Sequence, residues 1–510
     1  MVLINAVRKD LYADSVALMR IAATLTGEPG VETVSLVMGT PANKEVLSAS
    51  GLLTADGTAA GPNDLLLAVR GTREAADTAL GRAVAALRDS GPEPAGRAEG
   101  EEDLPVRSLA TAPPGTDLAV ISVPGAYAAA ETRKALRAGM HAFVFSDHVD
   151  LADEVALKTE AAARGLLVMG PDCGTAVVAG VPLGFANAVR PGPVGLVGAS
   201  GTGLQQVACL LHARGSGVSH VLGTGSRDVS REVGGLTMLA ALDALAADPA
   251  TERIVLVSKP PDPEVARRVL ARAAVCGTPV VACFLGWEGP VPEGVVRATT
   301  LAEAAEAAEA AAPGNAPRPD TPIPDSPFSR PAAAPLLRAL YTGGTFAHEA
   351  HQLLAPRLAD GILRQLSASA AELPARHLVL DLGDDAYTAG RPHPMIDPTV
   401  RTALLRAALA DPRTGLVLVD VVLGHGAAPD PAGALLDALA AAGHTPASGP
   451  PVLAFVVGTD ADPQPAAEAR RRLRAAGVLL ADSSTHAARL AAAHLAPAPA
   501  PVPARGGARA

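Results

Sequence analysis

The stretch "GLVGASGTGLQQVACLL", residues 195–211, joins an apolar strand to a helical pattern through a turn of small residues. Apolar strands that alternate with helices are typical of a parallel sheet covered on both faces. A second stretch, "RALYTGGTFAHEAHQLL" at residues 338–354, has the same order of strand, glycine turn and helix. The two turns align as Ser200-Gly201-Thr202 over Gly343-Gly344-Thr345. This pair predicts an α/β protein with a duplicated unit.

Two longer segments support the duplication. Residues 239–270 and 401–439 each contain Ala-Asp-Pro, then an apolar strand, then Pro-Asp-Pro and a helical pattern, in the same order. The spacing drifts by several residues, so the pattern predicts a duplicated domain and not a short-period repeat. The alternative is that alanine-rich α/β sequences resemble one another without a common repeat.

Composition divides the chain into further parts. Residues 1–92 alternate strands and helices in the manner of a small α+β domain. We expect α/β units over residues 115–191, 192–312 and 335–495. A proline-rich linker is expected over residues 313–334 and a disordered tail over residues 496–510.

Composition also limits the partners. The chain has 510 residues, 49% of them hydrophobic and only 2% aromatic, with a net charge of -10. Such a core is packed by Ala, Val and Leu, and no basic or aromatic surface for nucleic acid or an anionic membrane is expected. No apolar stretch is long enough to span a bilayer, and the first residues do not read as a signal peptide. The four cysteines form no Cys-x-x-Cys pair, so we expect a cytoplasmic protein with reduced thiols and no metal site.

The glycine turns are candidate anion sites. A helix N-terminus has unpaired backbone N–H groups and a partial positive charge, and small residues in front of it let an anion approach. The expected phosphate-binding residues are Ser200, Gly201, Thr202, Gly343, Gly344 and Thr345. The alternative for each turn is that the glycines only allow close packing of helix and strand.

Three residues are candidate catalytic groups. Lys259 follows a buried strand and could meet an anion as a point charge. Arg391 and His393 lie in "LDLGDDAYTAGRPHPMIDP", residues 380–398, where Arg391 offers a fork for an oxyanion and His393 could act as an acid or base. The alternatives are that Lys259 is a solvated lysine at a strand end and that residues 380–398 form a rigid loop with exposed charges.

Four further residues follow predicted strand ends and are candidates for substrate binding: Asp172, Cys173, Arg227 and Asp228. The alternatives are that Cys173 is a buried core residue and that Arg227 pairs with Asp228.

The motifs "VPGAYAAAETRKAL", "MGPDCG", "GLVGASGTGLQQ", "GTGSRD" and "ALAADPATERIVLVSKPP" resemble, in order, the α subunit of succinyl-CoA synthetase and its NDP-forming acyl-CoA ligase relatives. "GRPHPMIDP" and the second glycine turn resemble the FdrA branch of that superfamily. The resemblance implies a CoA-binding-like, Rossmann-like domain over residues 115–191, followed by two duplicated flavodoxin-like ligase domains. It adds Pro124 to the candidates for binding CoA or substrate, and it implies that two facing helix N-termini hold a phosphoryl group.

The chain departs from the ligases in two places. The ligases carry a phosphorylated histidine in a loop that here reads "WEGPVPEGVVRA" and contains no histidine. They also carry a glutamate that holds the phosphohistidine, and in this chain Lys259 occupies that region. The resemblance to FdrA implies a role in purine or allantoin breakdown, with phosphorolysis of oxalurate to oxamate and carbamoyl phosphate. We expect a small anionic substrate, partner enzyme subunits, a homo- or hetero-oligomer and no certain cofactor, with CoA or phosphate as candidates. The alternatives are an acyl-CoA ligase subunit that uses His393 or His425 as relay, and a non-catalytic scaffold that binds CoA or phosphate.

Overall fold

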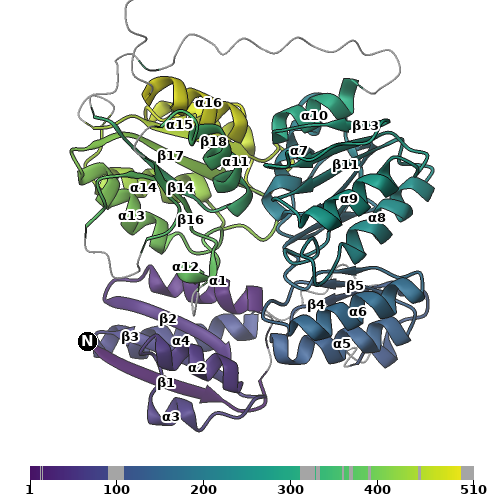
Figure 1. Cartoon of the computed structure of the whole chain (residues 1–510). Helices are drawn as coiled ribbons and strands as arrows, with labels where there is room; N and C mark the ends of the chain where they lie inside the picture. The colour runs from purple at the N-terminus through teal and green to yellow at the C-terminus, as the bar shows by residue number, and fades with distance from the viewer. Residues whose placement is uncertain are drawn as a thin grey trace, which may run out of the picture.

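The computed structural model describes residues 1–11, 13, 15–89, 108–310, 328, 334–358, 361–366, 372–388, 392–445 and 449–495. The chain folds around four sheets, of three, three, seven and six strands. Figure 1 shows how the helices and strands are arranged. Most of the linker expected at 313–334, the tail at 496–510, and Arg391 lie outside the described residues.

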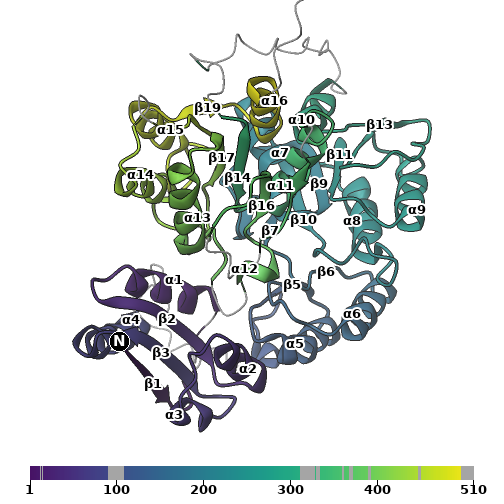
Figure 2. The same ribbon diagram turned by 60° about the vertical axis from the view of Figure 1, so that its left-hand side comes forward.

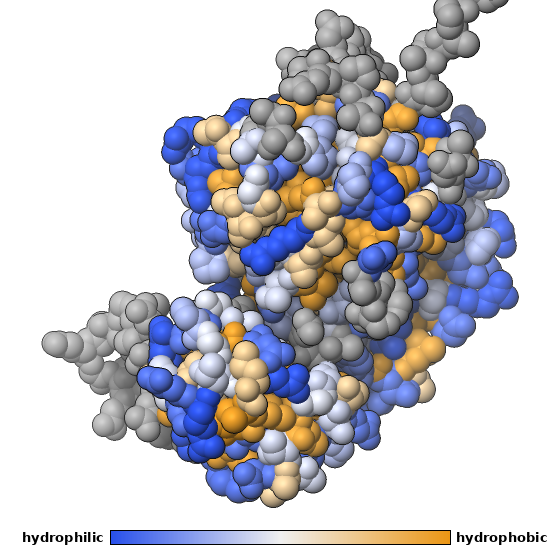
Figure 3. All heavy atoms as spheres, turned by 90° about the vertical axis from the view of Figure 1, so that its left-hand side faces the viewer, coloured by the Kyte–Doolittle hydropathy of each residue, from blue (hydrophilic) through white to orange (hydrophobic). Residues whose placement is uncertain are grey.

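The N-terminal domain is a three-stranded antiparallel sheet with the order β1-β3-β2. Its elements are β1 (Val2–Arg8), α1 (Ser15–Thr26), β2 (Val31–Met38), α2 (Pro41–Ala49), α3 (Ala55–Thr58), β3 (Leu65–Gly71) and α4 (Arg73–Asp89). Alternate residues of β3 enter two separate cores, with Leu67 facing α1 and α4 and Leu66 facing α2. Both faces of the sheet are therefore covered by helices, which confirms the predicted α+β domain. In the space-filling view this domain stands out as a lobe of its own, with polar and apolar side chains mixed over its visible face (Figure 3).

The second unit is a small parallel sheet with the order β4-β5-β6. Its elements are η1 (Leu109–Thr111), β4 (Leu118–Ile121), α5 (Gly125–Arg137), β5 (His141–Val144), α6 (Leu151–Ala163) and β6 (Val168–Met169). The hairpin that follows, β7 (Thr175–Val178) and β8 (Val181–Gly184), does not join this sheet. It pairs antiparallel with β10 of the next sheet. The seven-stranded sheet thus begins before residue 192, where the sequence placed a domain start.

The two large sheets repeat each other. The first continues with β9 (Pro191–Ala199), α7 (Gly201–Ala213), β10 (Val218–Gly223), α8 (Leu236–Ala247), β11 (Arg253–Ser258), α9 (Pro263–Ala273), β12 (Val280–Phe284), β13 (Val295–Arg297) and α10 (Leu301–Ala310). The second contains β14 (Leu336–Tyr341), α11 (Gly344–Leu354), β15 (Ile362–Leu363), β16 (His377–Asp381), α12 (Asp385–Thr388), α13 (Thr399–Ala410), β17 (Thr414–Val422), α14 (Pro431–Ala441), β18 (Val452–Val457), α15 (Ala466–Ala475), β19 (Leu479–Ala481) and α16 (Ser484–Leu495).

Their strand orders are equivalent. The parallel part of the first sheet reads β13-β12-β11-β9-β10, and the second reads β19-β18-β17-β14-β16 before its extra edge strand β15. In each sheet the strand before the glycine turn, β9 or β14, occupies the same place. The strand order therefore supports the duplication that the glycine turns predict.

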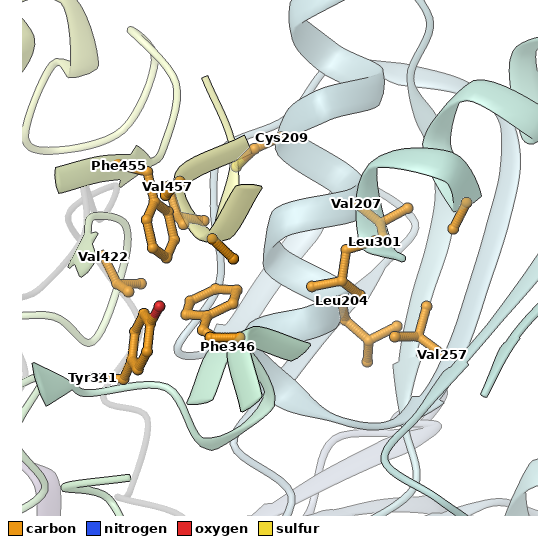
Figure 4. Close-up of a cluster of buried hydrophobic side chains, with 14 of the residues drawn as sticks. Leu204, Val207, Cys209, Val257, Leu301, Tyr341, Phe346, Val422, Phe455 and Val457 are labelled. Atoms are coloured by element: carbon orange, nitrogen blue, oxygen red, sulfur yellow. The ribbon is translucent and has the colours of Figure 1, made fainter. Parts of the chain in front are cut away.

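One apolar core spans both large sheets. It includes side chains of α7, α10, α11 and α16, which lie between the sheets (Figure 2). Leu204 and Val207 of α7 lie toward one sheet, while Phe346 of α11 meets Phe455 edge-to-face at 5.1 Å between ring centroids (Figure 4). Burial of this shared apolar surface holds the two α/β units together, and it fixes the helices whose N-termini form the candidate site.

Candidate functional site

The two glycine turns meet at the interface between the large sheets. Helix α7 begins at Gly201 with Ser200 as its N-cap, and α11 begins at Gly344 with Gly343 as its N-cap. The hydroxyl groups of Ser200 and Thr345 are 2.6 Å apart and buried. The N-termini of two helices that are far apart in the sequence are therefore in direct contact.

The contact is reciprocal. In the aligned turns, Ser200 corresponds to Gly343 and Thr345 corresponds to Thr202. A Cβ atom built on Gly343 would lie 2.8 Å from Oγ1 of Thr202, and one built on Gly203 would lie 3.0 Å from Cγ2 of Thr345. Small residues are required because each turn packs against the other across a local pseudo-twofold axis.

The starts of α10 and α16 are capped at the interface in an equivalent, reciprocal way. Glu349, the sixth residue of α11, accepts hydrogen bonds from Leu301 N at 2.8 Å, at the start of α10, and from the hydroxyls of Ser484 (2.5 Å) and Thr485 (2.8 Å). Gln206, the sixth residue of α7, accepts from Ser484 N at 3.3 Å, at the start of α16. Each unit thus caps the last helix of the other. Burial raises the pKa of the Glu349 carboxyl.

A lysine and a carboxylate flank the start of α11. The Nζ atom of Lys259 is 3.8 Å from Oδ2 of Asp381, at the end of β16. A Cβ atom on Gly344 would collide with that carboxylate and would lie 2.8 Å from the Lys259 Nζ. Burial raises the pKa of Asp381, while Lys259 acts in the opposite direction. The structure therefore places Lys259, a candidate catalytic residue, beside the start of α11 together with Asp381.

His393 packs against this carboxylate region. Its Nδ1 atom accepts a hydrogen bond from Met395 N at 3.2 Å, and its ring lies 5.6 Å from that of Phe185. A Cβ atom on Gly383 would lie 2.7 Å from the His393 Nε2 and 3.3 Å from Oδ1 of Asp381. Burial lowers the pKa of His393 to about 4, so the ring is neutral at pH 7. It can donate a hydrogen bond from Nε2 there, but it is a poor acid at that pH.

A buried carboxylate occupies part of the second turn. Asp420 accepts from the backbone N–H groups of Thr342 and Gly343, both at 2.9 Å, and Arg401 donates to it. The N–H of Gly343 is therefore already bound, which corrects its assignment as a phosphate ligand. The first N–H groups of α7 and α11 still have no partner within their own helices, as at any helix start. A Cβ atom on Gly201 would lie 3.0 Å from Oγ1 of Thr175.

The candidates for CoA or substrate binding gather near the end of β10 but are largely engaged. Cys173 is 2% exposed within an apolar core and burial raises the pKa of its thiol to about 12, which agrees with the alternative of a buried core residue and not with a thiol that borders a ligand. Asp172 accepts from the Ser226 hydroxyl at 2.5 Å. Arg227 and Asp228 do not pair with each other, which corrects the alternative expectation.

A buried charge network explains the last two residues. Arg227 pairs with Glu154 of α6, and Asp228 pairs with Lys158 at 2.8 Å while it accepts from backbone N–H groups at the start of α8. Lys158, Glu154 and Asp228 have fully buried side chains. This network joins α6 of the small parallel sheet to the seven-stranded sheet, so its role in the structure is one of packing between units.

The turn at Pro124 is also filled by the chain. Pro124 is the N-cap of α5 and makes no side-chain cap. A Cβ atom on Gly125 would lie 2.6 Å from the carbonyl oxygen of His148. Backbone therefore occupies the space before this helix, and the expected CoA-binding residues do not form an open cradle. His425, the alternative relay residue, is exposed and bonds through its backbone to Ala186.

Several site residues were not singled out from the sequence. Asp381 ends a strand, which is the one signal that could have identified it. Asp420 and Glu349 lie inside a strand and a helix, and only the assembled fold shows what they hold. In the part of the chain that the structure describes, no cluster of three or more His, Cys, Asp or Glu residues suits a metal ion. No helix among these residues is long and apolar enough to cross a membrane.

Comparison with known proteins assigns families to three segments. Residues 1–103 match the model "AllF, heavy metal-associated domain", residues 189–286 match "CoA binding domain", and residues 340–494 match "CoA-ligase". The CoA-binding match thus falls on the seven-stranded sheet and not on residues 115–191. Residues 1–103 contain neither Cys nor His, so the first domain has no thiolate or imidazole to offer a soft heavy metal.

The matches to solved structures are distant. A dinucleotide-forming acetyl-coenzyme A synthetase 1 from Ca. Korarchaeum cryptofilum is 18% identical, with 76% of this chain and 84% of that chain covered and a TM-score of 0.34. An ATP citrate lyase from Methanothrix soehngenii is 19% identical, with 38% and 34% covered and a TM-score of 0.30.

A full-length relative is much closer in sequence. The uncharacterized protein YahF of Escherichia coli (strain K12) is 38% identical over 509 residues, which cover 95% of this chain and 97% of that protein. The chain therefore belongs to the family of YahF, and it combines an AllF-type N-terminal domain with CoA-binding and CoA-ligase domains.

Proposed function

We propose that this protein handles an acyl phosphate or carbamoyl phosphate, as a subunit of a carbamoyltransferase that cleaves oxalurate with phosphate. The proposal combines the FdrA-like motifs with the AllF-type domain, whose description points toward allantoin breakdown. It also uses the absence of a histidine from residues 287–298, where the ligases carry their phosphorylated residue.

The observation that carries the proposal is the contact between two helix N-termini, with Lys259 beside one of them. One helix end stabilises an exposed anion by about 0.3–1 kcal/mol, and by up to about 2 kcal/mol when partly buried. Transfer of a doubly charged phosphate out of water costs more than one such helix end supplies. Two helix ends and an ammonium group give phosphate a site that needs no metal.

The reaction balances without a further reactant. A phosphate oxygen attacks the carbamoyl carbon of oxalurate, and the bond from that carbon to the oxamate nitrogen breaks. The nitrogen leaves as the amide of oxamate and takes the proton that phosphate gives up, while carbamoyl phosphate forms. In this scheme Gly201 and Gly344 mark the phosphate position, Lys259 offsets its charge, and His393 donates from Nε2 to the carbonyl oxygen. No step uses CoA.

We propose that the protein acts with partner subunits in a homo- or hetero-oligomeric enzyme. The test is to analyse the products that the purified, assembled complex forms. Incubation with oxalurate and phosphate should release oxamate and carbamoyl phosphate in equal amounts. A Gly344→Val variant that stays folded should lose phosphate binding, because the new side chain would displace Asp381 and Lys259. Absence of both products from an assembled wild-type complex would refute the proposal.

The second candidate is an NDP-forming acyl-CoA ligase subunit, which the CoA-binding and CoA-ligase matches favour. A ligase of this kind would carry a phosphorylated histidine. Incubation with γ-labelled ATP and a partner that binds nucleotide would then give an acid-labile, base-stable label on this chain. Absence of that label, together with phosphorolysis of oxalurate, would decide for the first candidate.

A further inference from the structure

A second group of basic side chains lies one helical turn beyond the helix end. His348 follows Gly344 by four residues on α11, so the two are about 6 Å apart along the helix axis. The Nη2 atom of Arg364, just after β15, is 3.4 Å from Nδ1 of His348. On the other side, a Cβ atom on Gly286 would lie 3.8 Å from the His348 Nε2. Residues from three parts of the chain therefore converge on one face of α11.

The charge of this group is only partly balanced. Lys259 pairs with Asp381 at 3.8 Å, but within the described part of the chain no carboxylate pairs with Arg364. Burial lowers the pKa of His348 to about 4, and Arg364 and Lys259 add to this effect because both repel a proton from the ring. His351, one turn further along, has its pKa lowered by burial and by Arg364. A guanidinium without a protein counter-ion, close to a second cation, is typical of an anion site.

We propose that Lys259, His348 and Arg364 form a second anion subsite, which holds the outer phosphate of a diphosphate group whose inner phosphate lies at the start of α11. A diphosphate with its terminal oxygens can span the distance between Gly344 and His348. Arg364 contributes a planar fork for a phosphate. The Nδ1 atom of His348 faces this guanidinium, which can only donate, so the proton of the neutral ring is on Nε2. The Nε2 atom lies on the side of Gly286, which carries no side chain, so Nε2–H is the group that we propose donates to the ligand. This assignment goes beyond the proposed function, which needs only one phosphate.

Calorimetric titration of the full-length protein tests the subsite, with pyrophosphate and orthophosphate as probes. Wild type should bind pyrophosphate more tightly than orthophosphate. Arg364→Gln should weaken pyrophosphate binding about tenfold, because one charge-assisted contact is lost, and should leave orthophosphate binding within about twofold. Arg357→Gln removes the same charge beyond the far end of α11, where Arg357 is exposed, and should change neither affinity. ADP and CoA, used as competitors, show which of them supplies the diphosphate.

Proton uptake gives a second, independent readout. The titratable or charged groups that act on His348 are Arg364, Lys259 and His351, and Asp381 pairs with Lys259. The free pKa of His348 is about 4; a bound anion offsets the two cations and raises it, so pyrophosphate affinity should increase as the pH falls from 6 to 4.5. Titrations in two buffers of different ionisation enthalpy measure this uptake, which His348→Asn should abolish.

The assignment fails if Arg364→Gln and His348→Asn both bind pyrophosphate as wild type does. Loss of orthophosphate binding in Gly344→Val, with these two variants unaffected, would leave the proposed function standing and remove only the second subsite.

Discussion

Glu349 is the residue whose removal most directly tests how the starts of α10 and α16 are held at the interface between the two α/β units. Its carboxylate is fully buried and accepts from Leu301 N, Ser484 Oγ and Thr485 Oγ1. Replacement by alanine leaves the Leu301 N–H without an acceptor at the start of α10, at a cost of about 1–3 kcal/mol. The lost side chain leaves a small cavity, and the two hydroxyls must find other partners. We expect a total loss of about 3 kcal/mol, local to α10 and α16.

Hydrogen exchange measured by mass spectrometry is the suitable assay, because a chain with several domains has no single free energy of unfolding. A loss of 3 kcal/mol should accelerate amide exchange in α10 by roughly a hundredfold. Glu306→Gln is the matched control on the same helix. Its pair with Arg214 is partly exposed at 40% and 26%, so exchange should change little.

The variant Glu349→Gln removes the charge of the side chain but keeps its shape. The amide oxygen can still accept from Leu301 N, as Gln206 does for Ser484 in the other unit, so the loss should be about 1 kcal/mol. Because burial raises the pKa of Glu349, the protonated form is favoured in the folded protein. Stability of the wild type is then greatest below the unfolded pKa and falls as the pH rises through the folded pKa, whereas the glutamine variant does not titrate. The stability difference between the wild type and the glutamine variant should therefore shrink at higher pH. Unchanged α10 exchange in Glu349→Ala would refute the capping argument.

Asp381→Asn should tighten orthophosphate binding in calorimetry, because the carboxylate lies beside Gly344 where an anion would bind; weaker binding would mean that Asp381 assists the ligand. Iodoacetamide should label the partly exposed Cys276 before Cys173, since burial raises the pKa of Cys173 to about 12; peptide mapping that finds Cys173 labelled first would contradict its burial. Lys158→Met should destabilise the junction of α6 and α8 by about 3–5 kcal/mol, because buried carboxylates lose their partner; a thermal midpoint equal to that of wild type would exclude this.

The sequence predicted the repeated fold because its signals are local. Apolar runs of strand length and glycine turns before helices recur in the same order, and the strand orders of the two sheets agree with them. The helix ends at Gly201 and Gly344 were predicted in the same way, from the residues on either side of each turn.

The buried polar residues could not be predicted because their partners are distant in the chain. Glu349 is 135 residues from Ser484, and nothing near Glu349 indicates that contact. Arg227 and Asp228 show the opposite difficulty. Adjacent opposite charges suggest a pair, but the turn directs Asp228 inward to Lys158 and the start of α8, and directs Arg227 toward Glu154.

The charges around the contact between the N-termini of α7 and α11 are not fully balanced. Two helix N-termini in contact bring together roughly half a positive charge each, which is unfavourable unless negative charge or hydrogen-bond acceptors compensate it. In the second unit Asp420 supplies a carboxylate, but Arg401 balances its charge. Asp381 supplies another, and Lys259 balances part of that. The interface therefore retains a positive surplus at the start of α11, where Asp381 and Lys259 lie against Gly344, and an anion bound beside them would remove the surplus.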